Sequence, residues 1–328
     1  SRMTSSYYPI HEKAGFDADA YAEKIDRALR AGDKDTVAKL IVDINNAQRQ
    51  QLKAPYKHRY GKELKDALDK KFSGDAEKLI FALIMTPLEY DLEQLEQAMK
   101  GMGTDENTLI EIICSRTPDQ LKAITAHYNK DPRHAKAPLE KAIAGDTSGE
   151  FKDLLIALVG GSKDGGHSTN DVQAKDDAVR LFADGKGKLK GGSGSHFLHI
   201  LATQNMYQLR KVFAEFEKLT QGAKIEDIIK KEFSGDLRQA YLTIVGATVN
   251  KQKFFAEQLY NSMKGLGTRE NDLIRVIVAR SEVDLNLIKE EFLHADFSKG
   301  KKTLEDTIKG DTSGVFRDTL LAICAGNQ

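Results

Sequence analysis

The chain repeats its own sequence, and this feature limits its fold more than any other. Met-Lys-Gly-Met-Gly-Thr at residues 99–104 returns 164 residues later as Met-Lys-Gly-Leu-Gly-Thr at residues 263–268. Gly-Asp-Thr-Ser-Gly at residues 145–149 returns 165 residues later at residues 310–314. Because self-similarity at a fixed spacing is the signature of a repeat architecture, the chain is predicted to consist of two similar halves.

Each half divides again. A Ser-Gly pair followed by an apolar helical stretch occurs at residues 73–74, 148–149, 234–235 and 313–314. These four units predict four repeats, and a run rich in Gly and Ser marks a linker between the halves. We place an N-terminal tail at residues 1–16, the repeats at 17–87, 88–160, 173–248 and 249–328, and the linker at 161–172.

The apolar residues follow helical spacing. Leu92, Leu95 and Met99 recur at i, i+3 and i+7, which places them on one buried face of a helix. Thr104 and Thr268 precede polar turns and apolar runs, as helix N-caps do. No segment shows sustained alternation of apolar and polar residues. The predicted fold class is therefore all-α.

Composition restricts the partners and the compartment. Lys plus Arg total 49 and Asp plus Glu total 49, so the formal net charge is zero. That balance excludes whole-molecule attraction to nucleic acid or anionic lipid, and a polyanion has to be met by a local patch or through a bound cation. No run approaches the ~18 apolar residues of a membrane span, and the polar residues 1–10 hold no signal core. With only two cysteines, Cys114 and Cys324, which we predict to be buried apolar side chains, a cytoplasmic protein is expected.

The glycine-rich motif at residues 99–104 and 263–268 has the chemistry of a cation site. Two glycines separated by one residue allow a tight turn with positive φ, which can aim several carbonyl oxygens at one point. Ca²⁺ takes about six to eight oxygen ligands, backbone carbonyls included, and a carboxylate is needed to balance its charge. Asp146 and Asp311 follow the last loop glycine by 43 and 44 residues, and each lies in a Gly-Asp-Thr-Ser-Gly turn.

Two other interpretations compete with a calcium site. A helix C-cap followed by an N-cap explains one such motif by itself, but the pairing of both copies with the same downstream Asp favours the ion. A phosphate-binding loop would need a Gly-Lys-Ser or Gly-Lys-Thr ending between a strand and a helix, and the motif has neither.

Together with three further motifs, these residues resemble the annexin family. The further motifs are Ser-Arg-Thr at residues 115–117, Ala-Arg-Ser at 279–281 and Asn-Ala-Gln-Arg-Gln at 46–50. The resemblance covers residues 16–328. It implies four five-helix repeats in a curved, right-handed superhelical disc, with Ca²⁺ loops on its convex face. It also implies Ca²⁺-dependent binding to acidic phospholipid by a cytoplasmic protein.

The resemblance assigns the ion ligands residue by residue. In the family, three loop carbonyls and one distal carboxylate hold the principal ion. These roles fall on Met99, Gly101, Gly103 and Asp146 in the second repeat, and on Met263, Gly265, Gly267 and Asp311 in the fourth. Minor sites are expected at Thr104 with Glu106 and at Thr268 with Glu270, where a capped helix start explains the same residues equally well.

The other two repeats depart from this pattern. In the first, the loop is expected at residues 27–32, where the two glycines are lost, and Lys71 takes the place of the acid. A cation there repels Ca²⁺, so this repeat is predicted to lack its principal site. The third repeat has a variant site, for which a solvated charged loop is the alternative, formed by Gly187, Lys190, Gly192 and Glu232.

These patterns predict a protein that binds membranes and catalyses no reaction. Bound Ca²⁺ would bridge the interhelical loops to phosphatidylserine-like headgroups, with no nucleic-acid partner. No Ser/His/Asp set, Cys/His cluster or dinucleotide fingerprint is present in the sequence. The alternative is an all-α repeat scaffold for protein partners with silent Ca²⁺ sites, its partner surfaces at residues 129–136 and 295–302. Protein partners and self-association on membranes stay open.

Two smaller features complete the predictions. Asp91 and Arg116 are expected to form a salt bridge that ties helices together, at positions that the family places near a central pore. His127, His134 and His294 stand singly in polar surroundings and are assigned no role.

Overall fold

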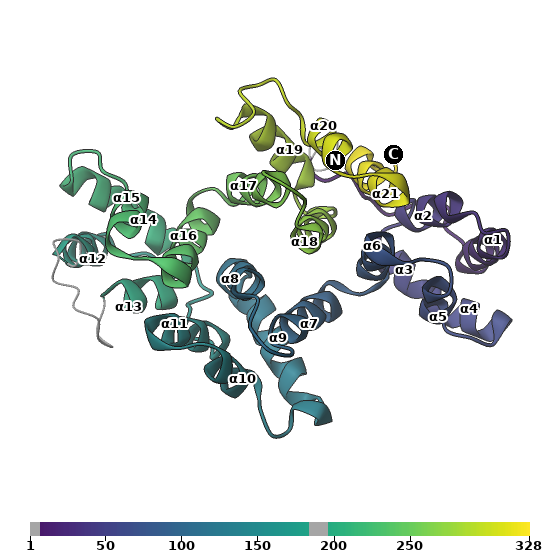
Figure 1. The fold of residues 1–328 in the computed structure, drawn as a ribbon. Coiled ribbons are helices and arrows are strands. Elements are labelled where there is room, and N and C mark those ends of the chain that lie inside the picture. Colours follow the sequence, from purple (N-terminus) through teal and green to yellow (C-terminus); the bar gives the residue numbers. More distant parts are fainter. Residues whose placement is uncertain (1–6, 184–195) are drawn as a thin grey trace. The chain divides into compact units, whose positions relative to one another are not determined.

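The computed structural model describes residues 7–183 and 196–328, and all regular structure in these ranges is helical (Figure 1). The first repeat contains α1 (Ala18–Arg30), α2 (Lys34–Val42), α3 (Asn46–Gln51), α4 (Lys53–Tyr60), α5 (Leu64–Asp69) and α6 (Gly74–Ile84). The second contains α7 (Pro87–Ala98), α8 (Glu106–Ser115), α9 (Pro118–Lys130), the short 3₁₀ helix η2 (Pro132–His134), α10 (Leu139–Asp146) and α11 (Gly149–Val159). The predicted all-α class is confirmed for the described residues.

The second half repeats this order. The third repeat contains α12 (Asp171–Ala183), α13 (His196–Thr203), α14 (Met206–Leu219), α15 (Ile225–Glu232) and α16 (Gly235–Val249). The fourth contains α17 (Lys251–Met263), α18 (Glu270–Arg280), α19 (Leu285–His294), α20 (Leu304–Asp311) and α21 (Gly314–Ala325). Within the described ranges, no helix has the length and hydropathy that a membrane span requires.

The first repeat has one helix more than five because its third helix is interrupted. Leu52 separates α3 from α4, and Pro55 follows three residues later. Proline has no N–H to donate to the carbonyl four residues back, which here belongs to Gln51. The interruption therefore falls where the helical hydrogen-bond pattern loses this bond.

The repeated Ser-Gly pairs form one recurring turn between the last two helices of each repeat. Each serine has an extended backbone at the N-cap, and each glycine begins the last helix with φ between 61° and 63°. Only glycine adopts this φ without strain. The Ser-Gly pair recurs in all four repeats because the backbone of this turn requires glycine.

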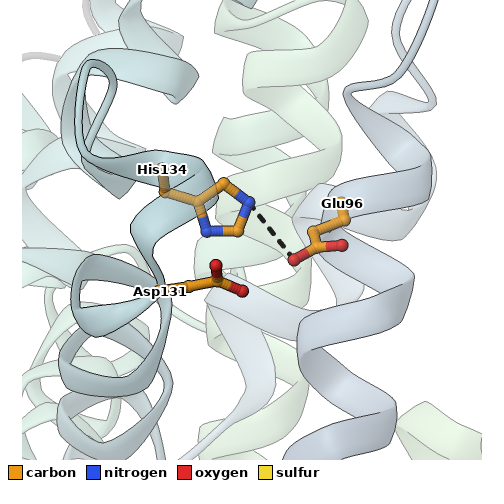
Figure 2. Close-up of side chains that lie close together, drawn as sticks. All are labelled: Glu96, Asp131 and His134. Carbon is orange, nitrogen blue, oxygen red and sulfur yellow. Dashed lines mark ion pairs between the residues drawn. The ribbon is translucent and has the colours of Figure 1, made fainter.

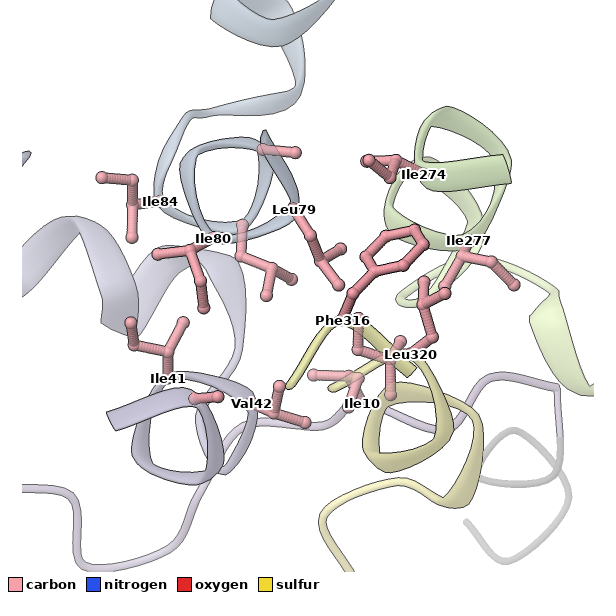
Figure 3. Packing of buried hydrophobic residues seen from close by; sticks show 14 of the residues in the cluster. Ile10, Ile41, Val42, Leu79, Ile80, Ile84, Ile274, Ile277, Phe316 and Leu320 are labelled. Carbon is pink, nitrogen blue, oxygen red and sulfur yellow. The ribbon is translucent and has the colours of Figure 1, made fainter. Parts of the chain in front are cut away.

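The helices gather into two compact units, which we describe separately. One unit comprises residues 7–90 with Gln252–Gln328, that is, the first and fourth repeats. Its core is formed by α2, α6, α18 and α21, whose apolar side chains meet as Figure 3 shows. Ile10 from the N-terminal segment joins this core with no exposed surface. Asn327 fixes the same segment, because its Nδ2 donates to the His11 carbonyl at 2.6 Å.

The second unit comprises the described part of Asp91–Lys251, that is, the second and third repeats. Here α8 packs on α16, and α12 packs on α14. Cys114 of α8 is buried, and burial raises the pKa of its thiol to about 12. Cys324 is likewise buried in the other unit, with its pKa raised to about 12. Both thiols are free, as buried apolar side chains would be.

The predicted salt bridge between Asp91 and Arg116 is confirmed inside the second unit. Arg116 Nε and Nη2 donate to the two carboxylate oxygens of Asp91 at 2.9 and 2.8 Å. Only 6% of the Arg116 side chain and 11% of the Asp91 side chain are exposed. This two-bond geometry is the strong form of the pair, and it joins α7 to the end of α8.

Candidate calcium sites

The first glycine-rich loop connects α7 to α8 and spans residues 99–105. Gly101 and Gly103 have φ values of 86° and 93°, a conformation that L side chains rarely adopt. The Asp105 N–H donates to the Ala98 carbonyl at 2.9 Å and closes the loop at its base. Met102, between the two glycines, is fully exposed at the tip.

The fourth repeat builds the same loop between α17 and α18. Gly265 and Gly267 have φ values of 89° and 87°. The Arg269 N–H donates to the Ser262 carbonyl at 2.7 Å, which closes this loop in the same way. Leu266 takes the place of Met102 at the tip and is also fully exposed.

Each loop lies beside the acidic turn that the sequence paired with it. Asp146 is the last residue of α10, and its carbonyl lies 3.5 Å from the Thr104 hydroxyl, which donates to it. Asp311 is the last residue of α20, and its carbonyl accepts from the Thr268 hydroxyl at 3.3 Å. The structure thus brings together two segments that are more than 40 residues apart, and it does so in the same way in both repeats.

The position of these acids is unfavourable without a cation. Asp146 and Asp311 are exposed, and each stands at the C-terminal end of a helix, where the helix dipole carries a partial negative charge. Each glycine loop begins at the C-terminal end of another helix, α7 or α17. Two negative helix ends and a carboxylate therefore converge, and this favours a bound positive ion.

The prediction that Thr104 and Thr268 are N-caps is wrong by one residue. Asp105 is the N-cap of α8, because its carboxylate accepts from the Thr108 N–H at 3.2 Å. Arg269 holds the corresponding position before α18 and makes no side-chain cap bond. The threonine hydroxyls are used instead to join each loop to its acidic turn.

The residues expected at minor sites lie next to these threonines. Glu106 is the first residue of α8, and Glu270 is the first residue of α18. Both side chains are half-buried. An acid in the first turn also stabilises its own helix, so the position by itself does not select between the two roles.

The third repeat shows half of its expected site. Glu232 is the last residue of α15 and is half-buried, at the place that Asp146 and Asp311 hold in their repeats. The loop residues predicted to join it lie outside the described residues, namely Gly187, Lys190 and Gly192.

The first repeat has a different connection. Residues 27–30 of the expected loop belong to α1, and only residues 31–33 link it to α2. Gly32 has a φ of 70° and ends the helix, and Asp33 caps α2 by accepting from the Thr36 N–H at 3.1 Å. Lys71 is exposed just after α5. This connection lacks the two-glycine turn that the second and fourth repeats share.

Two features near these loops did not emerge from the sequence reasoning. The apolar loop tips Met102 and Leu266 were not singled out, although their place between paired glycines is a signal for exposure. The statement that His134 stands singly is wrong, because its ring stacks on Tyr128 and its Nε2 lies 3.3 Å from Glu96 Oε1. Nothing in the sequence spacing connects His134 with a residue of α7.

The comparisons with known proteins agree with this architecture. A sequence model of the annexin family matches residues 17–83, 90–158, 187–244 and 254–323. Annexin A6 of Mus musculus is 42% identical over 320 residues, which cover 95% of this chain and 46% of that protein. The chain thus spans about half the length of this relative.

Solved structures show the same fold. Annexin III is 36% identical, with a TM-score of 0.90 over 98% of both chains. Calcium-bound annexin (Sm)1 is 27% identical, with a TM-score of 0.84 over 98% of this chain and 94% of that chain. The chain belongs to the annexin family. This family is known generally for Ca²⁺-dependent phospholipid binding, and its fold is a binding scaffold rather than an enzyme fold.

Proposed function

We propose that this protein binds acidic phospholipid membranes peripherally when Ca²⁺ rises, through ions shared between its interhelical loops and lipid phosphates. One observation carries the proposal: in the second and fourth repeats, a two-glycine loop and an acidic helix end lie side by side in the same arrangement. The calcium-bound relative annexin (Sm)1 supports the choice of ion. In cells, the protein would be cytoplasmic and would move to phosphatidylserine-like headgroups.

We assign the ligands of the two principal sites from the family motif, and the geometry supports this choice. The carbonyls of three loop residues would join one bidentate carboxylate, in the sets Met99, Gly101, Gly103 with Asp146 and Met263, Gly265, Gly267 with Asp311. Together they supply about five of the about six to eight oxygens that Ca²⁺ takes, so positions remain open for phosphate oxygens. Because the net charge of the chain is zero, the ion provides the attraction that the protein alone lacks.

Each loop tip is suited by itself to contact with a membrane. Met102 and Leu266 are fully exposed apolar side chains at the same place in two repeats. Contact with a bilayer would remove part of this apolar surface from water, which is favourable. The exposed Lys100 and Lys264 precede the first loop glycines. Each would add ~1 kcal/mol of attraction near an acidic surface.

Further ligands extend the proposal to weaker sites. Minor ions would be held by Thr104 with Glu106 and by Thr268 with Glu270, and a third-repeat ion by Glu232 with Gly187, Lys190 and Gly192. The first repeat would hold no principal ion, because its connection is short and Lys71 stands where an acid is needed.

Vesicle pelleting tests the function. We expect the protein to sediment with phosphatidylserine vesicles when Ca²⁺ is present and to stay in the supernatant when the ion is chelated. Phosphatidylcholine vesicles should retain little protein at the same Ca²⁺ concentration. Equal pelleting with and without Ca²⁺, or none in either case, would favour the scaffold with silent Ca²⁺ sites.

A further inference from the structure

Three side chains that can bind metal meet beside the first glycine loop, outside the proposed calcium ligands. Figure 2 shows Glu96 from α7 together with Asp131 and His134 from the segment that follows α9. One ligand atom from each lies within 4.8 Å of the others. Among residues 7–183 and 196–328, these three form the one group of at least three His, Cys, Asp or Glu side chains whose ligand atoms lie close enough to hold a metal ion.

The histidine is oriented as a metal ligand. His134 Nδ1 lies 3.0 Å from the Tyr128 carbonyl, which can only accept, so Nδ1 carries the proton in the neutral ring. The lone pair of the neutral ring is then on Nε2, which faces Glu96 Oε1 at 3.3 Å. Stacking on the Tyr128 ring, at 3.8 Å and 6° between planes, holds the imidazole in this position. A hydrogen bond from the second ring nitrogen is the usual support of a metal-binding histidine.

The Asp131 carboxylate is anchored through one oxygen, and all three side chains remain accessible. Asp131 Oδ1 accepts from the Arg133 backbone N–H at 2.9 Å, which anchors the carboxylate at the start of η2. The exposed fractions of the side chains are 29% for Glu96, 25% for Asp131 and 15% for His134. The corner of the second repeat formed by Glu96, Asp131 and His134 is therefore partly shielded from water but open to an ion.

The fourth repeat shows what this corner requires for packing alone. The positions 164 residues after Glu96 and Tyr128 are Tyr260 and Phe292. Phe297 stacks on Tyr260 with ring centroids 4.1 Å apart and packs edge-on against Phe292 at 5.0 Å. Three aromatic rings thus fill the corner of the fourth repeat. The second repeat places an acid and an imidazole there, and at the same offset Asp131 corresponds to Ala295 and His134 to Ser298.

We propose that Glu96, Asp131 and His134 form a site for a zinc-class divalent transition ion, separate from the calcium loops. One imidazole and two carboxylates suit Zn²⁺, whereas Ca²⁺ takes oxygen ligands. With ligands about 2.0–2.1 Å from the ion, adjacent tetrahedral donors lie about 3.3–3.4 Å apart. The 3.3 Å between His134 Nε2 and Glu96 Oε1 matches that edge. An Asp131 oxygen would have to move closer to complete the set, because the ligand atoms of the three residues lie only within 4.8 Å of one another. Water would take the fourth position.

Arg133 competes with the ion for the same carboxylates. Its Nη2 lies 3.2 Å from Glu96 Oε1 and also pairs with Asp131. The Arg133 side chain is 69% exposed, and surface ion pairs contribute little, so a metal ion can displace it from the two carboxylates. Without a metal, the arginine balances the two acids, and with a metal it would turn outward. Its removal should therefore strengthen metal binding.

Zinc titration of the full chain tests the site. The protein is first saturated with Ca²⁺, so that the calcium loops do not take up the probe, and Zn²⁺ binding is then measured by calorimetry. Visible absorption of Co²⁺ in the same site reports the coordination geometry. We expect one site in the wild type, at least about tenfold weaker binding in His134→Gln, and severalfold tighter binding in Arg133→Gln.

His127→Gln is the matched control. His127 lies on α9, is exposed, and its Nδ1 lies 2.9 Å from the Ala123 carbonyl. This variant should bind Zn²⁺ as the wild type does, and circular dichroism should show intact helices in all variants. The proposal is overturned if the wild type binds no Zn²⁺ or if His134→Gln binds as the wild type does. It is also overturned if His127→Gln weakens binding as much as His134→Gln. None of these results depends on vesicle binding.

Discussion

We expect the double variant Asp146→Ala/Asp311→Ala to lose most of its Ca²⁺-dependent pelleting with phosphatidylserine vesicles. Each substitution removes a carboxylate from a helix end whose backbone carbonyl accepts from Thr104 or Thr268 of a glycine loop. An interaction with a charged partner contributes at least about 1.5–3 kcal/mol, so the Ca²⁺ concentration for half-maximal binding should rise more than about tenfold. Pelleting across a range of Ca²⁺ concentrations measures this shift.

A second double variant separates ligand loss from loss of negative charge. Asp119→Ala/Asp318→Ala removes the same charge from exposed positions on α9 and α21, away from the loops. It should pellet as the wild type does, and both double variants should retain the helical circular dichroism signal. Full binding by Asp146→Ala/Asp311→Ala would show that these acids hold no principal ion.

The largest effect on stability is expected for Asp91→Ala. Arg116 donates two hydrogen bonds to Asp91, and both side chains are almost fully buried. Removing one partner of a buried ion pair costs about 3–5 kcal/mol, and here Arg116 loses both of these hydrogen bonds and the Asp91 charge. Urea unfolding, followed by circular dichroism, should show this loss as a lower midpoint.

An exposed ion pair in the same unit provides the control. Lys211 and Asp171 lie on the surface, with 43% and 76% of their side chains exposed. Asp171→Ala should leave the urea midpoint almost unchanged, since exposed pairs contribute little. If Asp91→Ala were as mild as Asp171→Ala, the buried pair would not be the tie between α7 and α8 that its geometry indicates.

The four repeats could be predicted from the sequence because each repeat needs glycine at a fixed position, where few other residues adopt the backbone conformation. Gly149 and its three counterparts take positive φ at the start of the last helix, so the Ser-Gly signal recurs wherever that turn does. The predicted buried face of Leu92, Leu95 and Met99 was only partly right, because Leu95 is fully buried whereas Leu92 and Met99 are half-buried. The break at Leu52 was not predicted. Proline is tolerated in the first turn of a helix and interrupts a helix interior, and the sequence alone did not show which position Pro55 takes.

The sequence predicted those parts of the candidate calcium sites that short motifs encode. Equal spacing from loop to acid in two repeats predicted that the turns of Asp146 and Asp311 lie beside the glycine loops, as they do. The N-cap prediction was one residue off because Thr104 and Asp105 both have side chains that can cap a helix. In the structure, Thr104 contacts the acidic turn, and Asp105 caps α8. The corner formed by Glu96 and His134 escaped notice, since its members are far apart in sequence and follow no spacing rule.

The shared ion is the central claim, and one measurement tests it most directly: the Ca²⁺ binding isotherm of the wild type with and without phosphatidylserine vesicles. If lipid phosphate completes the coordination of Ca²⁺, each ligand must raise the affinity for the other by the same factor. We expect weak Ca²⁺ binding in solution and much tighter binding with vesicles. The vesicles should raise the affinity for Ca²⁺ by the same factor by which Ca²⁺ raises the affinity for vesicles. A Ca²⁺ affinity that vesicles leave unchanged would contradict the account.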